Sequence, residues 1–107
     1  MTFTCLLRIE PGNGRIEALA LEPGMGINEP VHVPSASPDH EGWLMAVVDR
    51  ATGDVMAGEY ESELWIVDAG QIGGGPVARI PIPLKQRSQV HGWWVSAAEL
   101  AKARHQA

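Results

Sequence analysis

Short apolar runs alternate along this chain with clusters of glycine, proline and polar residues, and this spacing is typical of an all-β protein. The runs return roughly every 10–15 residues, and most of them are too short for helices. We expect antiparallel strands over residues 3–10, 15–21, 29–34, 42–49, 63–69 and 76–83. A β-sandwich, a small barrel or a series of propeller blades would all give this spacing of strands, and the pattern alone does not distinguish these folds.

The connections between these runs carry the residues that turns need. Pro11 to Gly14 reads as a hairpin turn, because glycine and asparagine tolerate positive φ. Residues 22–28 read as a glycine-rich loop and residues 50–59 as a long turn. Residues 71–75 hold successive glycines without the lysine and helix of a phosphate-binding loop, so we interpret them as a flexible connector.

The apolar content of individual strands indicates how deeply each is buried. Residues 15–21 carry apolar groups on both faces, which predicts a strand covered on two sides. Trp43 and Trp65 lie inside apolar runs and are expected in the core. Only the end of the chain looks helical. Ser96 and Glu99 have the spacing of a capping box, and good helix formers follow, so we expect a short helix over residues 96–106.

Composition limits the classes of protein to which the chain can belong. Its 107 residues suffice for one small domain or a piece of a larger one. The net charge is −5, and the acids are concentrated in residues 1–68, whereas residues 69–107 hold Glu99 as their one acid. No basic stripe with interleaved aromatic residues is present, so we exclude nucleic acid as a partner.

The sequence shows no sign of export or of a membrane span. Cys5 is the single cysteine, which excludes an internal disulfide. No apolar run approaches the roughly 20 residues of a membrane-spanning helix. The first residues are too short and wrongly ordered for a signal peptide. We therefore expect a soluble, cytoplasmic chain.

The stretch His91-Gly92-Trp93-Trp94 is the most chemically suggestive part of the sequence. An imidazole can bind a metal or move a proton near neutral pH. Gly92 lets the backbone pass close to a neighbouring group, and the two tryptophans could exclude water. The alternative is a structural histidine at the end of a strand. Three further histidines, at positions 32, 40 and 105, lack ligand spacing and are interpreted as solvated or strand-surface residues.

Five segments of the sequence occur in the same order as in the C-terminal part of the carotenoid cleavage oxygenase family, which includes the lignostilbene dioxygenases, and they resemble that part. The resemblance implies that the chain is a single partial domain, residues 1–107, holding the last one to two blades of a seven-bladed β-propeller. The matching segments are residues 29–34 (EPVHVP), 41–44 (EGWL), 62–69 (SELWIVDA), 76–80 (PVARI) and 91–94 (HGWW).

The same resemblance implies a chemistry. The family holds a non-haem Fe(II) with four histidines, and His91 falls at the position of the last of them. Glu29 falls at a glutamate that accepts the other ring N–H of a ligand histidine. The implied reaction is the insertion of O₂ across a conjugated C=C bond of a carotenoid, apocarotenoid or stilbene, which gives two carbonyl products.

The chain also departs from the family pattern. His32 stands where an aromatic residue is usual, and the chain is far shorter than a full member, so three ligand histidines would lie outside it. We therefore expect the chain alone to be inactive and to self-associate, and contact with a membrane could come only from parts that it lacks. The alternative hypothesis is a truncated, non-catalytic β-module that binds a partner through unpaired strands.

Overall fold

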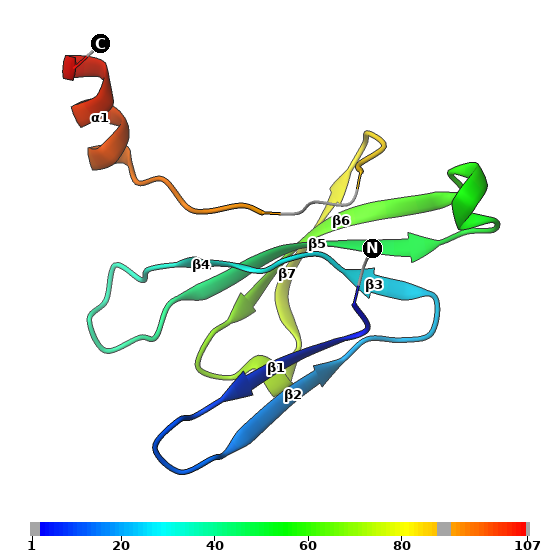
Figure 1. Cartoon of the computed structure of the whole chain (residues 1–107), viewed down its shortest axis with the longest axis horizontal. Helices are drawn as coiled ribbons and strands as arrows, with labels where there is room; N and C mark the ends of the chain where they lie inside the picture. The colour runs from blue at the N-terminus through cyan, green and yellow to red at the C-terminus, as the bar shows by residue number, and fades with distance from the viewer. Residues whose placement is uncertain (1–2, 88–90, 107) are drawn as a thin grey trace.

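The computed structural model describes residues 3–87 and 91–106, and at its centre is a five-stranded antiparallel sheet (Figure 1). The order β3-β5-β6-β7 runs across it, and β4 pairs with β5 beside β3. Residues 88–90, directly before His91, lie outside the described parts. The strands are β3 (Met25–Ile27), β4 (Val31–Val33), β5 (Trp43–Ala51), β6 (Tyr60–Asp68) and β7 (Pro76–Ile82).

A separate hairpin packs on one face of this sheet, which we call the hairpin face. It consists of β1 (Cys5–Ile9) and β2 (Ile16–Ala20), and Gly14 at its turn has a φ of 71°. Leu19 and Leu21 pack against the buried core of the sheet. That core is built from the apolar side chains of three strands: Met25, Ile27, Ala46, Val48 and Trp65.

The opposite side of the sheet, which we call the open face, is apolar as well. Strand register separates the two faces, because side chains alternate along a strand. Ala46 pairs with Trp65 on the hairpin face, whereas Met45 pairs with Val31 on the open face. Most open-face side chains are only half-buried; Val47 is buried, and Ile80 is 46% exposed. The open face therefore offers apolar area that the described residues cover only in part.

The C-terminal helix is confirmed, and so is the capping box at its start. α1 (Ala97–Gln106) follows Ser96, whose Oγ accepts a hydrogen bond from the Glu99 N–H at 3.1 Å. The Glu99 carboxylate accepts the Ser96 N–H in return. Figure 1 shows the helix standing away from the sheet at the end of an extended segment, and its described side chains are exposed. The expected all-β antiparallel architecture with one short terminal helix is thus confirmed.

Three expectations about single segments were wrong. Residues 22–28 were expected as loop, but β3 forms there and pairs with β5. The connection at residues 71–75 is an ordered 3₁₀ turn, η2 (Ile72–Gly74), because Ile72 is completely buried and its N–H donates to Glu17. β2 was expected to be covered on both faces, yet Ile16, Ala18 and Ala20 are exposed.

Other segments agree with their predictions or extend them. Trp65 is buried, as expected, whereas Trp43 is half-buried and its ring lies 4.4 Å from that of His40. β6 begins at Tyr60, three residues before its predicted start, and the turn before it contains η1 (Val55–Ala57). No helix within residues 3–87 and 91–106 is long and apolar enough to span a membrane.

Candidate functional site

The segment between β3 and β4 carries one residue more than the strand opposite it. Ile27 pairs with Val48 and Val31 pairs with Met45, so Asn28, Glu29 and Pro30 lie opposite two residues of β5. An extra residue on one strand is the defining feature of a β-bulge, and bulges often re-aim a side chain at a site. Pro30 suits this place because it has no N–H to donate to the ladder.

The Glu29 side chain and the ring of His91 lie together at this bulge. The distance from Glu29 Oε2 to His91 Nδ1 is 3.0 Å, although the residues are 62 positions apart in the sequence. The carboxylate is about half-buried, with 40% of its side chain exposed, whereas the imidazole is 80% exposed. An ionised carboxylate can only accept, so this contact requires a proton on Nδ1; when the ring is neutral, that tautomer leaves a lone pair on Nε2 that can bind a metal.

The residues after His91 lie along the open face of the sheet. A Cβ added to Gly92 would lie 3.3 Å from Val31 Cγ2, so this backbone runs close over β4. Trp93 is 78% exposed and Trp94 is 46% exposed. Together with Glu29 they line a shallow pocket of about 200 Å³, whose floor is apolar and comes from three strands: Val31, Val33, Met45, Ala46, Val47 and Leu64.

The other histidines are held elsewhere, by local contacts. His32 Nε2 lies 2.8 Å from the Glu41 carbonyl, and His105 is in the last turn of α1. The Gly42 N–H donates to His40 Nδ1, and His40 Nε2 lies 3.1 Å from Asp68 Oδ1. This close contact with His40, together with a hydrogen bond from the Gly70 N–H, holds the pKa of Asp68 below its ordinary value. These contacts fix the loop before β5 to the end of β6.

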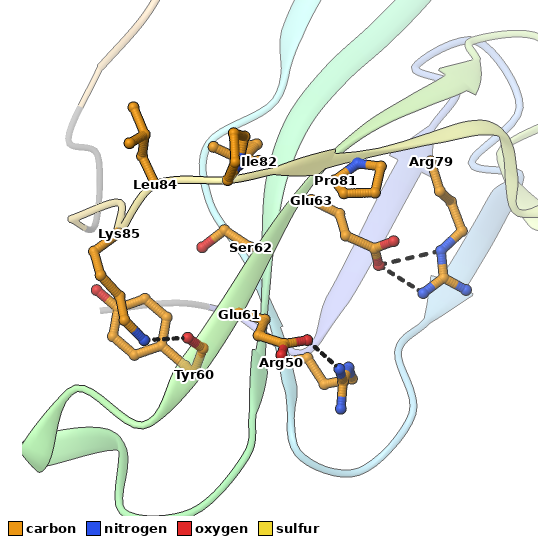
Figure 2. A pocket seen from close by; sticks show the side chains of 11 residues that line it. Arg50, Tyr60, Glu61, Ser62, Glu63, Arg79, Pro81, Ile82, Leu84 and Lys85 are labelled. Carbon is orange, nitrogen blue, oxygen red and sulfur yellow. Dashed lines mark hydrogen bonds and ion pairs between the residues drawn. The ribbon is translucent and has the colours of Figure 1, made fainter.

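A cavity of about 470 Å³ lies away from His91, between β5, β6 and β7 (Figure 2). Four of its charged side chains form two ion pairs. Arg50 contacts Glu61 at 2.5 Å and Arg79 contacts Glu63 at 2.6 Å, and the second contact holds the pKa of Glu63 below its ordinary value. Lys85 donates to the carbonyls of Gly58 and Tyr60. Each of these three cationic side chains already has a partner within the chain. We therefore interpret the cavity as a surface groove lined by ion pairs.

A metal ion at His91 would need ligands from elsewhere. Within the described parts of the chain, no three His, Cys, Asp or Glu residues lie close enough together to hold an ion. His91 nevertheless has the features of one ligand: its Nδ1 faces a carboxylate, its Nε2 makes no hydrogen bond to the residues that the structure describes, and the ring is exposed. The residues present therefore fit one ligand position of a metal site that is built from several histidines.

Comparisons with known proteins identify the family of the chain. The sequence model of the retinal pigment epithelial membrane protein family matches residues 1–96. The chain belongs to this family. It is the carotenoid oxygenase family that the five segments resemble, so that prediction is confirmed. Proteins named as oxygenases and dioxygenases are among the relatives of the chain.

Three relatives show how much of a family member the chain represents. Lignostilbene-alpha,beta-dioxygenase isozyme III of Sphingomonas paucimobilis is 33% identical over 76 residues, which are 69% of this chain and 14% of that protein. Isoeugenol monooxygenase of Pseudomonas putida is 36% identical over 70 residues, 64% of this chain and 13% of that protein. The crystal structure of Pseudomonas brassicacearum lignostilbene dioxygenase matches with a TM-score of 0.71 at 29% identity, covering 88% of this chain and 19% of that one.

The chain thus spans less than one fifth of the length of these relatives. The sequence singled out Glu29 and His91, and the structure brings them into contact. Sequence reasoning missed Asn28, which is buried beside Glu29. The available signal was an asparagine directly before Glu-Pro, between two apolar runs.

Proposed function

We propose that this chain is the part of a non-haem Fe(II) oxygenase that supplies one metal ligand, His91, and the carboxylate that supports it, Glu29. The contact of 3.0 Å between Glu29 Oε2 and His91 Nδ1 carries this proposal. In metal-binding proteins a ligand histidine usually donates its other ring N–H to a carboxylate or carbonyl, which fixes the tautomer and raises ligand basicity.

The four-stranded run β3-β5-β6-β7 is proposed to be a blade of a β-propeller, with β1 and β2 belonging to its neighbour. Antiparallel sheets that are apolar on both faces must be covered on both faces, and stacked blades provide that cover. The hairpin already covers one face of the sheet, and the open face, which the described residues cover only in part, would pack against the next blade. The remaining histidine ligands would come from other blades.

The proposed reaction is the cleavage of a conjugated C=C bond by O₂. One alkene and one O₂ give two carbonyl compounds, so no further oxidant or reductant is needed. Bound iron would supply the activation of O₂. Glu29 would hold the His91 proton on Nδ1, and the Trp93–Trp94 segment would limit the access of water to the ligand.

The substrate class is proposed from the names of the relatives. These name lignostilbene, isoeugenol and resveratrol, all of which conjugate an aromatic ring with a C=C bond. We therefore favour a stilbene-like substrate over a carotenoid or apocarotenoid. A cytoplasmic location remains part of the proposal.

A chimera tests the proposal directly. The segment of Pseudomonas brassicacearum lignostilbene dioxygenase that matches this chain would be replaced by residues 1–96, and bound iron and stilbene cleavage would be measured. The proposal expects stoichiometric iron and turnover in the chimera, and loss of both in its His91→Ala variant. A folded chimera whose His91→Ala variant kept its iron would refute the ligand role.

The second candidate, a non-catalytic β-module that binds a partner, is favoured by one observation. The outer face of the β1–β2 hairpin is apolar and exposed, with Leu7 at 55%, Ile9 at 60% and Ile16 at 62%. Apolar patches of this kind are typical of interaction surfaces. A folded chimera without iron, together with a stable complex of the chain alone, would support this candidate.

A further inference from the structure

Asn28 is a buried polar residue next to the bulge that carries Glu29. Only 2% of its surface is exposed. Its backbone N–H donates to the Val47 carbonyl at 2.9 Å, and its side-chain Nδ2 donates to the same carbonyl at 3.0 Å. Asn28 thus makes two hydrogen bonds to β5 next to the position of the extra residue.

A second layer of contacts fixes the Asn28 side chain. Nδ2 lies 3.4 Å from Asp49 Oδ2, and the other oxygen of that carboxylate accepts a hydrogen bond from Ser62 Oγ at 2.6 Å. Ser62 is 4% exposed and lies on β6, opposite Asp49. The three side chains therefore form a polar chain from β6, through β5, to the bulge. Buried polar networks whose members are satisfied specify one local arrangement.

The position of the bulge decides which way Glu29 points. Side chains alternate along a strand, so moving the extra residue by one place would reverse the face of each residue in between. We propose that Asn28 is a positioning residue: with Asp49 and Ser62 behind it, it pins the extra residue so that the Glu29 carboxylate faces His91. This inference deepens the proposed function and rests on the roles given there to Glu29 and His91.

The tautomer of His91 provides a direct readout that needs no metal. If Glu29 accepts the Nδ1–H, the neutral ring carries its proton on Nδ1, and imidazole ¹⁵N chemical shifts report this. The chain would be labelled in a background carrying Ile16→Lys, which places a charge on the exposed face of β2 and limits self-association. Glu29→Gln sets the reference for the lost contact.

We expect Asn28→Ala and Asn28→Asp to shift the His91 tautomer ratio toward that of Glu29→Gln. The aspartate variant keeps the size of the side chain but loses both Nδ2 contacts. Ser62→Ala should give a smaller shift in the same direction. The matched control is Val67→Ala, which removes two methyl groups from a residue that is 1% exposed and outside the network; it should destabilise the sheet without moving the tautomer ratio.

Folded Asn28 variants with the parental His91 tautomer would overturn the inference. If neither Asn28 variant folds, the test rests on Ser62→Ala. An unchanged His91 tautomer ratio in a folded Ser62→Ala variant would also overturn the inference. The outcome is separate from the proposed function. A shifted tautomer together with an iron-free chimera would retain the positioning role and reject the metal site, whereas an unshifted tautomer in an iron-loaded chimera would do the reverse.

Discussion

His91 is the residue on which the proposed chemistry depends most. In the iron-loaded chimera, we expect His91→Ala to abolish iron retention and cleavage, because the loss of one ligand opens the site to water and upsets its geometry. Trp94→Phe should be far milder, because Trp94 is 46% exposed and lines a wall of the site. Metal analysis and product formation measure both effects, and equal losses in the two variants would argue for a packing role of the whole segment.

Glu29 gives a more selective change at the same site. Glu29→Gln keeps the size of the side chain and some hydrogen bonding but removes the charge that faces His91 Nδ1. Iron affinity or turnover of the chimera should fall by roughly 10–100-fold, the usual effect of losing such a supporting group. Thermal unfolding should change little, because the amide fills the same space. Unchanged iron binding would reduce Glu29 to a strand-end carboxylate.

Asp68 connects a local contact to the pH dependence of stability. Its pKa is lowered in the folded chain by the close contact with His40 and by the hydrogen bond from the Gly70 N–H, so its stabilising contribution is present above the unfolded-state pKa of about 4. That contribution is lost as pH falls through the folded-state pKa. Asp68→Asn should therefore lower the free energy of unfolding at pH 7, and the difference from the parent should shrink in acid. Urea titrations at several pH values measure this, and a difference that stayed constant with pH would contradict it.

At the scale of elements, sequence reasoning succeeded where a strand has a periodic pattern of its own. The strands at β1, β2, β5 and β7 and the capped helix all have local signals. β3 was missed because Met25-Gly26-Ile27 is short and sits among glycines and prolines, so that only its pairing with β5 makes it a strand. η2 was missed for a similar reason. Ile72 is buried by segments that are distant in the sequence, and the glycines next to it give no local sign of this burial.

In the candidate site, too, some features could be predicted from the sequence and others could not. His91 and Glu29 could be named from the family motifs, because each stands in a matching segment. The pairing of β5 with β3 and β4 creates the bulge, and no single segment contains that information. The Asn28, Asp49 and Ser62 contacts join three separate elements, so the sequence offered only an unexplained asparagine.

The helix α1 is an element whose stability is separate from that of the sheet. Ser96→Ala removes the cap and should cost the helix about 1 kcal/mol. Because its described side chains are exposed, the melting of the sheet should not change. Loss of the helical NMR shifts of residues 97–106 at an unchanged melting temperature is the expected result. A lower melting temperature would show that the helix packs on the sheet in solution.

The molecule as a whole is more open than its length predicts. Its accessible surface is 7639 Å², whereas a compact protein of 11.5 kDa exposes about 5,800 Å². Its radius of gyration is 15.8 Å, against about 13 Å for a compact domain of 100 residues. The exposed large apolar side chains include Leu7, Ile9 and Ile16 on the outer face of the hairpin and Ile80 on the open face of the sheet.

This openness predicts self-association of the isolated chain. Ile16→Lys should weaken the association about tenfold or more, because it places a charge in the apolar face of β2. Met56→Lys is the matched control, since Met56 is 94% exposed but lies in η1, away from that face. Sedimentation equilibrium measures the association. A monomeric parent with a sharp, cooperative melt would show that the exposed faces are tolerated.

The extra residue at Asn28 to Pro30 also makes the length of this segment a constraint in its own right. If Pro30 were deleted and both flanking pairings were kept, Glu29 would stand opposite Ala46, and its carboxylate would enter the apolar core. That outcome is costly whatever the neighbouring side chains are. A gene encoding this segment can therefore exchange amino acids here more freely than it can gain or lose a codon.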